Sequence, residues 1–518
     1  MSATNPDTAC KLHPISIPYR IMQNLPGVLV LAFVVVFMIG ELEGGLATPV
    51  GGIVILIGII GICGWQIAYY KRFRYELTHD TFDIRSGVIS RRNREIPYRR
   101  IQNVDISRSL LQRVIGVAEL RLETAGGGQS EAHLRYVGYD EAKRLQEEVR
   151  SRTRGIERGE IDLDRGERDD GGIPTLLYQI SDRDLAILAI ASFDLRVLSV
   201  LVVGLTFVAP GVLIDLITVI PIEPVAIILA VLLIVVISSA ILSGTSAIIN
   251  NWGFELSRIG DELRYERGLL QRYDGSIPLD KVQTLVILEN VIMRYFKYAS
   301  LKIETAGYAP GQGAAESARA VPISDRETTF AIAKDVEDFG DDYTFSRPAV
   351  QARIRYAWQY SLMLGIVVAI AYAVNWGTEF AFRWWLLLTL AILIPFAAHF
   401  KWKHRGYAIT RHHILMRTGF WRRQTHIVPY YRIQNVDFVQ SILQRRWGIA
   451  TVVIDTAGSS GLIAGDPIAF DIHEEEATLL QNRLAQELQS SLRIRERRRR
   501  VLDVESPRRE SQGIRGSW

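Results

Sequence analysis

The hydropathy pattern of the chain alternates between six apolar runs, grouped in three pairs, and three longer polar stretches. The apolar runs cover Val28 to Ile39, Val50 to Tyr69, Val197 to Ile217, Val225 to Leu242, Gln359 to Val374 and Trp384 to Phe400. Most reach the length at which a helix crosses a hydrocarbon core of about 30 Å. The first and fifth are short, and a buried soluble helix is the alternative for each. The pattern predicts six membrane spans in three hairpins.

The basic residues next to these runs predict the orientation of the chain, because positive flanks stay in the cytoplasm. They are Lys11 and Arg20 before the first run, Lys71, Arg72 and Arg74 after the second, and Lys401, Lys403 and Arg405 after the sixth. The hairpin tips carry Glu41, Glu43, Glu223 and Glu379 instead, with Arg383 the one basic residue there. We therefore expect a multi-pass protein of the cell (plasma) membrane, with the polar stretches and both termini in the cytoplasm.

The polar stretches repeat one another at fixed spacing. A proline lies ten residues after a glycine, five before a glutamine and 27 before a threonine in each copy. The motif residues are Gly87, Pro97, Gln102 and Thr124 in the first copy, Gly268, Pro278, Gln283 and Thr305 in the second, and Gly419, Pro429, Gln434 and Thr456 in the third. Such a period indicates three copies of one folding unit.

Short apolar or alternating runs within a copy predict strands. In the first copy these are Tyr75 to Leu77, Phe82 to Ile84, Val88-Ile89 and Glu119 to Leu122, and the third copy repeats them. The glycine is expected to adopt a positive φ in a turn, and the proline to close a strand. Leu110 to Ile115 predicts a short amphipathic helix. Each copy ends in a helical pattern near whose start lies an acidic residue, Asp140, Asp325 or Asp471, expected to stabilise the first turn.

Several of these motifs together carry a family resemblance. Tyr75-Glu76-Leu77-Thr78, Glu95-Ile96-Pro97-Tyr98-Arg99-Arg100-Ile101-Gln102-Asn103-Val104 and Leu122-Glu123-Thr124-Ala125-Gly126 resemble the bacterial pleckstrin-homology-like (PH-like) domain of the YdbS/YdbT type. The third copy matches closely, and the second departs at Leu279 to Thr284 and Tyr295 to Lys297. The resemblance covers residues 20 to 490 and implies the triplicated YdbT architecture.

The fold class expected is membrane α-helical hairpins plus α+β. Each PH-like unit would be a bent antiparallel sheet, or partly open barrel, with a C-terminal helix, and a two-helix transmembrane hairpin would precede it. The predicted boundaries are an N-terminal tail at 1–24, hairpins at 25–70, 182–245 and 341–400, PH-like domains at 71–151, 246–340 and 401–490, a charged linker at 152–181 and a basic tail at 491–518.

The repeated polar residues do not form a catalytic set, because an amide is no base at neutral pH. We expect the glutamine to be a buried structural residue and Thr-Ala-Gly to be a strand exit. His412 and His413 are adjacent and would face opposite sides of a strand, so a shared metal ion is not expected. Cys10 and Cys63 are too few for a thiolate metal site or a disulfide framework. No enzyme activity, metal or cofactor is predicted.

The functional signal is electrostatic. Candidate ligands for anionic headgroups are Arg91, Arg92, Arg94, Arg99, Arg100, Arg422, Arg423 and Arg432. Guanidinium groups match phosphate oxygens, and each cation near an anionic leaflet contributes up to about 1 kcal/mol. The alternative is that basic residues collect at cytoplasmic membrane faces for topological reasons alone.

The function predicted is therefore a non-enzymatic scaffold that binds membrane lipids, protein or peptide partners, or further copies of itself, while nucleic acid is not expected as a partner. The resemblance points to envelope stress. The rival is a component or regulator of a transport or efflux system, which would require Asp194 and Arg196 to lie within the bilayer.

Overall fold

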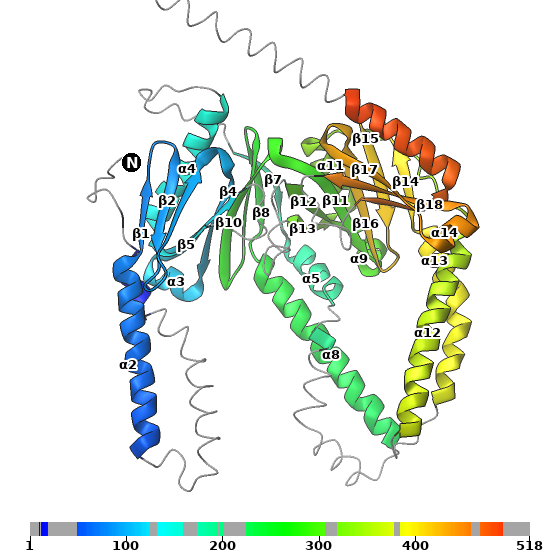
Figure 1. Cartoon of the computed structure of the whole chain (residues 1–518), viewed down its shortest axis with the longest axis horizontal. Helices are drawn as coiled ribbons and strands as arrows, with labels where there is room; N and C mark the ends of the chain where they lie inside the picture. Colours follow the sequence, from blue (N-terminus) through cyan, green and yellow to red (C-terminus); the bar gives the residue numbers. More distant parts are fainter. Residues whose placement is uncertain are drawn as a thin grey trace, which may run out of the picture. The chain divides into compact units, whose positions relative to one another are not determined.

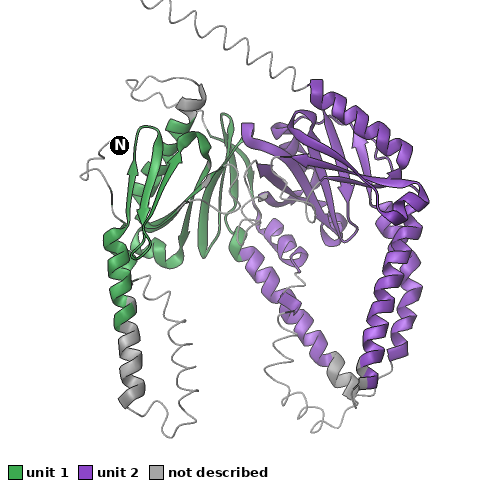
Figure 2. Ribbon diagram, viewed as in Figure 1, with its two compact units in different colours: residues 1–179, 249–278 green, residues 180–248, 279–518 purple. Residues whose placement is uncertain are grey.

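The structure is a computed structural model that describes residues 10, 12–18, 49–124, 132–158, 174–193, 197–199, 224–305, 319–377, 384–456 and 467–490 (Figure 1). The chain divides into two compact units, shown in Figure 2. The first contains residues up to Gln179 together with Ile249–Pro278, and the second contains Ile180–Ile248 and everything from Leu279 onwards.

Each copy of the repeat forms three strands before its proline and three after it. The first copy consists of β1 (Arg74–Leu77), β2 (Thr81–Ser86), β3 (Arg92–Pro97), the 3-10 turn η2 (Tyr98–Arg100), β4 (Ile101–Ser109), α3 (Leu110–Ile115), β5 (Val117–Thr124), β6 (Ala132–Gly138) and α4 (Tyr139–Arg158). The strands β1, β2 and β5 and the helix α3 lie where the sequence predicts them. Val88-Ile89 is a turn, the third strand begins after it, and β4 and β6 were not predicted.

The second and third copies follow the same order. The second has β8 (Glu255–Ile259), β9 (Glu262–Arg267), β10 (Gln271–Pro278), η3 (Leu279–Lys281), β11 (Val282–Asn290), α9 (Val291–Phe296), β12 (Tyr298–Thr305), β13 (Arg319–Asp325) and α11 (Arg326–Val336). The third has β14 (Gly406–Ile409), β15 (His413–Thr418), β16 (Arg422–Pro429), η5 (Tyr430–Arg432), β17 (Ile433–Val439), α14 (Ile442–Trp447), β18 (Ile449–Thr456), β19 (Ile468–His473) and a helix over residues 474–490.

The repeated glycines and prolines shape each copy as expected. Gly87, Gly268 and Gly419 have φ values of 103°, 104° and 85°. A Cβ atom on Gly87 would lie 1.9 Å from the carbonyl oxygen of Ser90, so the turn requires glycine. Pro97, Pro278 and Pro429 are the last residues of β3, β10 and β16, because proline has no N–H to donate to a ladder.

The long helices coincide with four of the six predicted spans. They are α2 (Pro49–Arg72), α8 (Pro224–Asn251), α12 (Ala352–Gly377) and the continuous pair η4 (Trp384–Leu393) and α13 (Ile394–Lys403). Among the described residues, Ala230–Asn251, Ala352–Ala373 and Trp384–Lys403 are long and apolar enough to cross a membrane. The first predicted span lies outside the described residues and so does most of the third, so the count of six stays a prediction.

The linker predicted over residues 152–181 is shorter than expected. Its first residues continue α4 to Arg158, and β7 (Thr175–Gln179) pairs with β8 near its end. The segment after it forms α5 (Asp182–Ala191), whose Ile187, Leu188 and Ala191 pack in one buried cluster with Met293 of α9.

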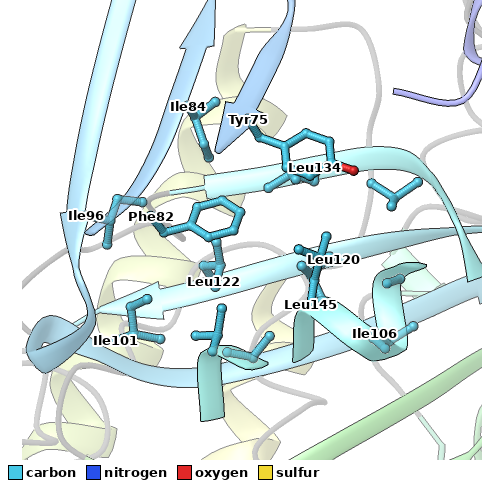
Figure 3. Close-up of a cluster of buried hydrophobic side chains, with 14 of the residues drawn as sticks. Tyr75, Phe82, Ile84, Ile96, Ile101, Ile106, Leu120, Leu122, Leu134 and Leu145 are labelled. Atoms are coloured by element: carbon cyan, nitrogen blue, oxygen red, sulfur yellow. The ribbon is translucent and has the colours of Figure 1, made fainter. Parts of the chain in front are cut away.

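The core of the first copy lies between its two sets of strands and α4 (Figure 3). Phe82 from β2, Leu120 and Leu122 from β5 and Leu134 from β6 have no exposed surface, and Leu145 of α4 is 1% exposed. Burial of such side chains contributes about 1.5–3 kcal/mol each. The alternation of buried and exposed positions along each strand sets which face joins this core.

The sheets cross the boundaries between copies. A seven-stranded sheet runs in the order β6-β5-β4-β10-β9-β8-β7, and a six-stranded sheet in the order β13-β12-β11-β16-β15-β14. The fourth strand of one copy therefore pairs with the third strand of the next copy, first through β4 and β10 and then through β11 and β16. We call these pairings the first and second joints. The predicted second PH-like domain, residues 246–340, contributes strands to both compact units.

Candidate membrane-contact surface

The turn between the second and third strands of each copy carries two apolar residues directly after the glycine, and the second of them is exposed in every copy. The pairs are Val88-Ile89, Leu269-Leu270 and Phe420-Trp421, and we call them the apolar tips. Ile89 is 83% exposed, Leu270 45% and Trp421 76%. A soluble surface rarely repeats such exposure at equivalent positions, so the tips indicate contact with an apolar partner.

The first tip is fixed to the end of a long apolar helix. Nη1 of Arg72, the last residue of α2, donates to the carbonyl oxygen of Val88 at 2.7 Å. The basic residues at this end of α2 are typical of the cytoplasmic boundary of a span. The hydrogen bond therefore holds the first tip beside the basic end of α2.

The second and third tips occupy the same place relative to their own helices. The N–H groups of Gly268 and Leu269 donate, each at 2.9 Å, to the carbonyl oxygens of Trp252 and Ile249 at the end of α8. The ring of Phe420 stacks on Phe400 of α13 with a centroid distance of 4.9 Å. All three tips thus lie at the terminus of an apolar helix, although different contacts hold them there.

The short helix after the fourth strand adds apolar surface beside two of these tips. In α3, Leu110 is 47% and Val114 85% exposed, and in α9 Tyr295 is 82% exposed. Nη1 of Arg113 in α3 donates to the carbonyl oxygen of Leu269 at 3.0 Å, which brings α3 next to the second tip.

The third tip lies beside the short helix α9 of the second copy, as the second tip lies beside α3 of the first copy. Nη2 of Arg294 in α9 donates to the carbonyl oxygen of Phe420 at 2.6 Å. The caps that start these helices are encoded locally: Ser109 and Gln112 form a capping box before α3, and Asn290 accepts from the N–H of Met293 before α9. The second and third tips therefore each lie beside the exposed apolar side chains of a short helix from the preceding copy.

Only part of the predicted arginine set lies at a tip. Arg91 and Arg92 are exposed and follow the first tip after Ser90, and Arg422 is exposed directly after the third tip. Arg99 and Arg100 are exposed in η2, at the other end of β3, about 20 Å away along an extended strand. Arg94 is exposed between these two ends. The five guanidiniums of the first copy therefore do not form one cluster.

The structure moves two predicted ligands away from the tips. Arg423 lies in the second joint, where its Nη2 and Nε donate to Oε2 of Glu289 at 2.5 and 2.8 Å. Arg432 in η5 donates to the carbonyl oxygen of Asp280 and lies over the ring of Tyr431. Both side chains hold protein surfaces together, because β16 pairs with β11 in this unit.

The predicted role of the repeated glutamine holds in one copy and fails in another. Gln283 is buried and its Nε2 donates to the carbonyl oxygen of Lys281 at 3.3 Å, whereas Gln434 is exposed. The repeated threonines end β5, β12 and β18, which confirms a strand exit at Thr124, Thr305 and Thr456.

The acidic residue at the start of the last helix also differs between copies. Asp325 caps α11 by accepting from the N–H of Thr328 at 3.0 Å, as predicted. Asp471 instead lies in β19 with no exposed surface, where it pairs with Arg355 and accepts from Tyr356 and from Nε2 of Gln444. Its prediction as a helix-capping residue was wrong.

The histidines are separated in space. His412 is exposed in the turn before β15, and His413, the first residue of β15, is buried beside Glu337. Within the described ranges, no group of three or more histidine, cysteine, aspartate or glutamate side chains is placed to hold a metal ion. Asp194 and Arg196, on which the transport hypothesis depended, lie outside the described residues.

Sequence reasoning missed the apolar tips. The sequence analysis predicts a strand at Val88-Ile89 because it is a short apolar run after the break at Ser86-Gly87. The available signal is that an apolar pair follows the turn glycine in every copy, with an arginine one or two residues after the pair. A solvated turn would carry polar residues there.

The class of protein follows from comparison with known families. A profile described as "Bacterial PH domain" matches residues 27–153, 186–337 and 356–493. The chain therefore belongs to the bacterial PH domain family, with three copies that each include the apolar region before them.

One relative matches this chain over nearly its whole length. The chain is 24% identical to the UPF0699 transmembrane protein YdbT of Bacillus subtilis (strain 168) over 491 residues, covering 91% of this chain and 97% of the relative. No solved structure matches significantly. The chain is accordingly a membrane protein of the YdbT type with repeated PH-like copies.

Proposed function

We propose that this protein is a non-enzymatic scaffold whose PH-like copies lie on the cytoplasmic leaflet and bind anionic lipid phosphates at their apolar tips. Six spans in three hairpins would anchor the copies, with both termini in the cytoplasm. The observation that carries the proposal is the recurrence, in all three copies, of an apolar pair whose second member is exposed and which is held at the end of an apolar helix.

The energetics favour insertion of the tips. An apolar side chain transferred from water into the interfacial region gains up to about 1.5–3 kcal/mol. Arg91 and Arg92 beside the first tip and Arg422 beside the third add up to about 1 kcal/mol each on an anionic leaflet. Membrane-spanning helices next to the tips would hold them at the surface in advance, so little entropy would be lost when the tips engage the lipid.

The chemistry of this surface supports binding without catalysis. Forked guanidinium donors match phosphate oxygens, and the neighbouring apolar side chains reach the acyl boundary. Neither group supplies a nucleophile with a base, which is what a hydrolytic site would need. A scaffold explains three copies of one surface, since repeated weak contacts add avidity.

The test uses the full-length chain in lipid nanodiscs, because the joints make the copies share sheets. In a Cys10→Ser, Cys63→Ala background, Ile89→Cys is labelled with an environment-sensitive fluorophore. We expect a blue-shifted emission that nitroxide lipids quench, and a stronger effect when phosphatidylglycerol is included. The additional blue shift caused by phosphatidylglycerol should fall as the salt concentration rises, because it depends on exposed charges.

Two matched variants complete the experiment. Arg91→Gln with Arg92→Gln should remove the phosphatidylglycerol increment and leave the basal blue shift. The same label at Arg99→Cys, at the far end of β3, should report water in every lipid. An Ile89 label with the water-like emission of the Arg99 label would refute the proposal, and an increment insensitive to both arginines would refute its lipid-phosphate component.

A further inference from the structure

The two joints between copies have the same register. In the first, Gln271 of β10 lies opposite Ser109 of β4. In the second, Arg422 of β16 lies opposite Asn290 of β11. In both, the residue seven before the proline of one copy faces the residue twelve after the proline of the preceding copy. The register therefore belongs to the repeat itself.

A side-chain contact repeats with this register. Arg113 and Arg294 each lie sixteen residues after their proline, and each donates to the carbonyl oxygen nine residues before the next proline. Those acceptors belong to Leu269 and Phe420, the first residues of the second and third tips. Arg445 occupies the same position in the third copy and Val88 carries the corresponding carbonyl in the first.

One third strand and one fourth strand take no part in the two joints: β3 of the first copy and β17 of the third copy. Among the described residues, β3 is the edge of the sheet β1-β2-β3, and β17 is the edge of the sheet β17-β18-β19. Arg92 to Glu95 in β3 are all exposed, whereas Thr425 to Ile427, which correspond to Asn93 to Glu95, are buried in β16. Strand edges with open backbone groups are templates for a further strand.

The other terminal edge shows the same difference. Val439 in β17 is 44% exposed, while the corresponding Ser107 in β4 is 2% and Leu288 in β11 is 7% exposed. Phe438 is half-buried where Ile106 and Ile287 are fully covered. The third copy thus carries the surface that a following copy covers elsewhere in the chain.

We propose that the β17 edge of one chain pairs with the β3 edge of a second copy of this chain, in the register of the two internal joints. That register places Val439 opposite Arg92 and Asp437 opposite Arg94, so opposite charges face each other. Arg445 would donate to the carbonyl oxygen of Val88. The contact is heterologous, so it generates rows or closed rings along the membrane.

The charges on β3 do not prevent such pairing. Charged edge strands commonly block association, but β10 has Arg272 and Asp274 in the corresponding stretch and pairs with β4 all the same. The proposal does not depend on lipid binding. Strands pair through backbone groups at the sheet edge, whereas the side chains stand roughly perpendicular to the sheet.

The test is crosslinking between two differently tagged full-length chains in native membranes, both in the Cys10→Ser, Cys63→Ala background. One chain carries Arg92→Cys and the other Val439→Cys, two exposed positions outside the core. A short bismaleimide should give a product with both tags, because facing Cβ atoms lie about 5 Å apart. Asn435→Cys, exposed and on the same face of β17 about 13 Å along, is the matched control and should not react.

Three outcomes overturn the proposal: no product with both tags, equal reaction of Asn435→Cys, or crosslinking confined to single chains that carry both cysteines. Charge reversal gives a second readout. Asp437→Arg in both tagged chains should reduce their co-purification about fivefold, and adding Arg94→Asp to both chains should restore it. Failure of the restoration, with both variants folded, would show that the two strands do not face each other.

Discussion

His426 makes the second joint sensitive to acid. It lies in β16 between Val286 of β11 and Met416 of β15, with 2% of its surface exposed. Burial, and to a lesser extent the charge of Lys302, lowers the pKa of its imidazole from 6.5 to about 4. The folded protein therefore holds this side chain neutral where an unfolded chain would protonate it.

The sign and size of the effect follow from linkage. Between about pH 6.5 and pH 4 the unfolded state binds more protons, so stability is complete above pH 6.5 and is lost as the pH falls toward 4. From about pH 8 to about pH 5 the loss from this group is about 2 kcal/mol. His426→Gln, which cannot titrate, should remove that loss.

Hydrogen exchange detected by mass spectrometry is the assay, applied to full-length protein in nanodiscs and corrected for the intrinsic rate at each pH. In the wild type, peptides from β11 and β16 should exchange about 30-fold faster at pH 5 than at pH 8, each rate being taken relative to the intrinsic rate at that pH. In His426→Gln the ratio should stay near one. Other titrating groups, such as His404, whose pKa burial also lowers, are common to both proteins and cancel. Equal acid sensitivity of the two proteins would refute the reasoning.

Three further substitutions probe the joints and the third copy, each measured by thermal unfolding in detergent. Gly275→Ala in β10 should cost about 2 kcal/mol, because a Cβ atom there would lie 2.6 Å from the ring of Tyr265; an unchanged midpoint would contradict this contact. Lys297→Gly should stabilise by about 0.5–1 kcal/mol, since Lys297 has a φ of 61° where the other copies have glycine; destabilisation would disprove strain at this cap. Asp471→Ala should cost about 3–5 kcal/mol by leaving Arg355 unpaired, with Asp471→Asn costing less; a loss below about 1 kcal/mol for alanine would show that the pair is not structural.

The elements of each copy were predictable because local chemistry specifies them. A glycine that needs positive φ, a proline that ends a strand and a serine or asparagine that caps a short helix act within a few residues of themselves. Gly87 and Pro97 therefore located the ends of β2 and β3 to within a few residues. The apolar helices followed from length and composition in the same way.

The joints could not be predicted because alternation defines the faces of a strand and not its partner. All three copies have chemically similar third and fourth strands, so the sequence did not indicate that β10 would pair with β4. Arg423 was assigned to lipid for the same reason: its partner Glu289 is 134 residues away in the chain. Asp471 was assigned to a helix start because a helical pattern follows it, but its three side-chain contacts come from distant elements.

The most direct test of the central claim is the membrane depth of the three tips. Nitroxide labels at Ile89, Leu270 and Trp421, one at a time in the full-length chain in liposomes, are compared by power saturation with oxygen and with a water-soluble nickel complex. The account predicts that all three tips are more accessible to oxygen than to nickel, while a label at Arg99 shows the reverse. Three tips with the nickel accessibility of the Arg99 label would contradict the claim that these copies lie on the bilayer.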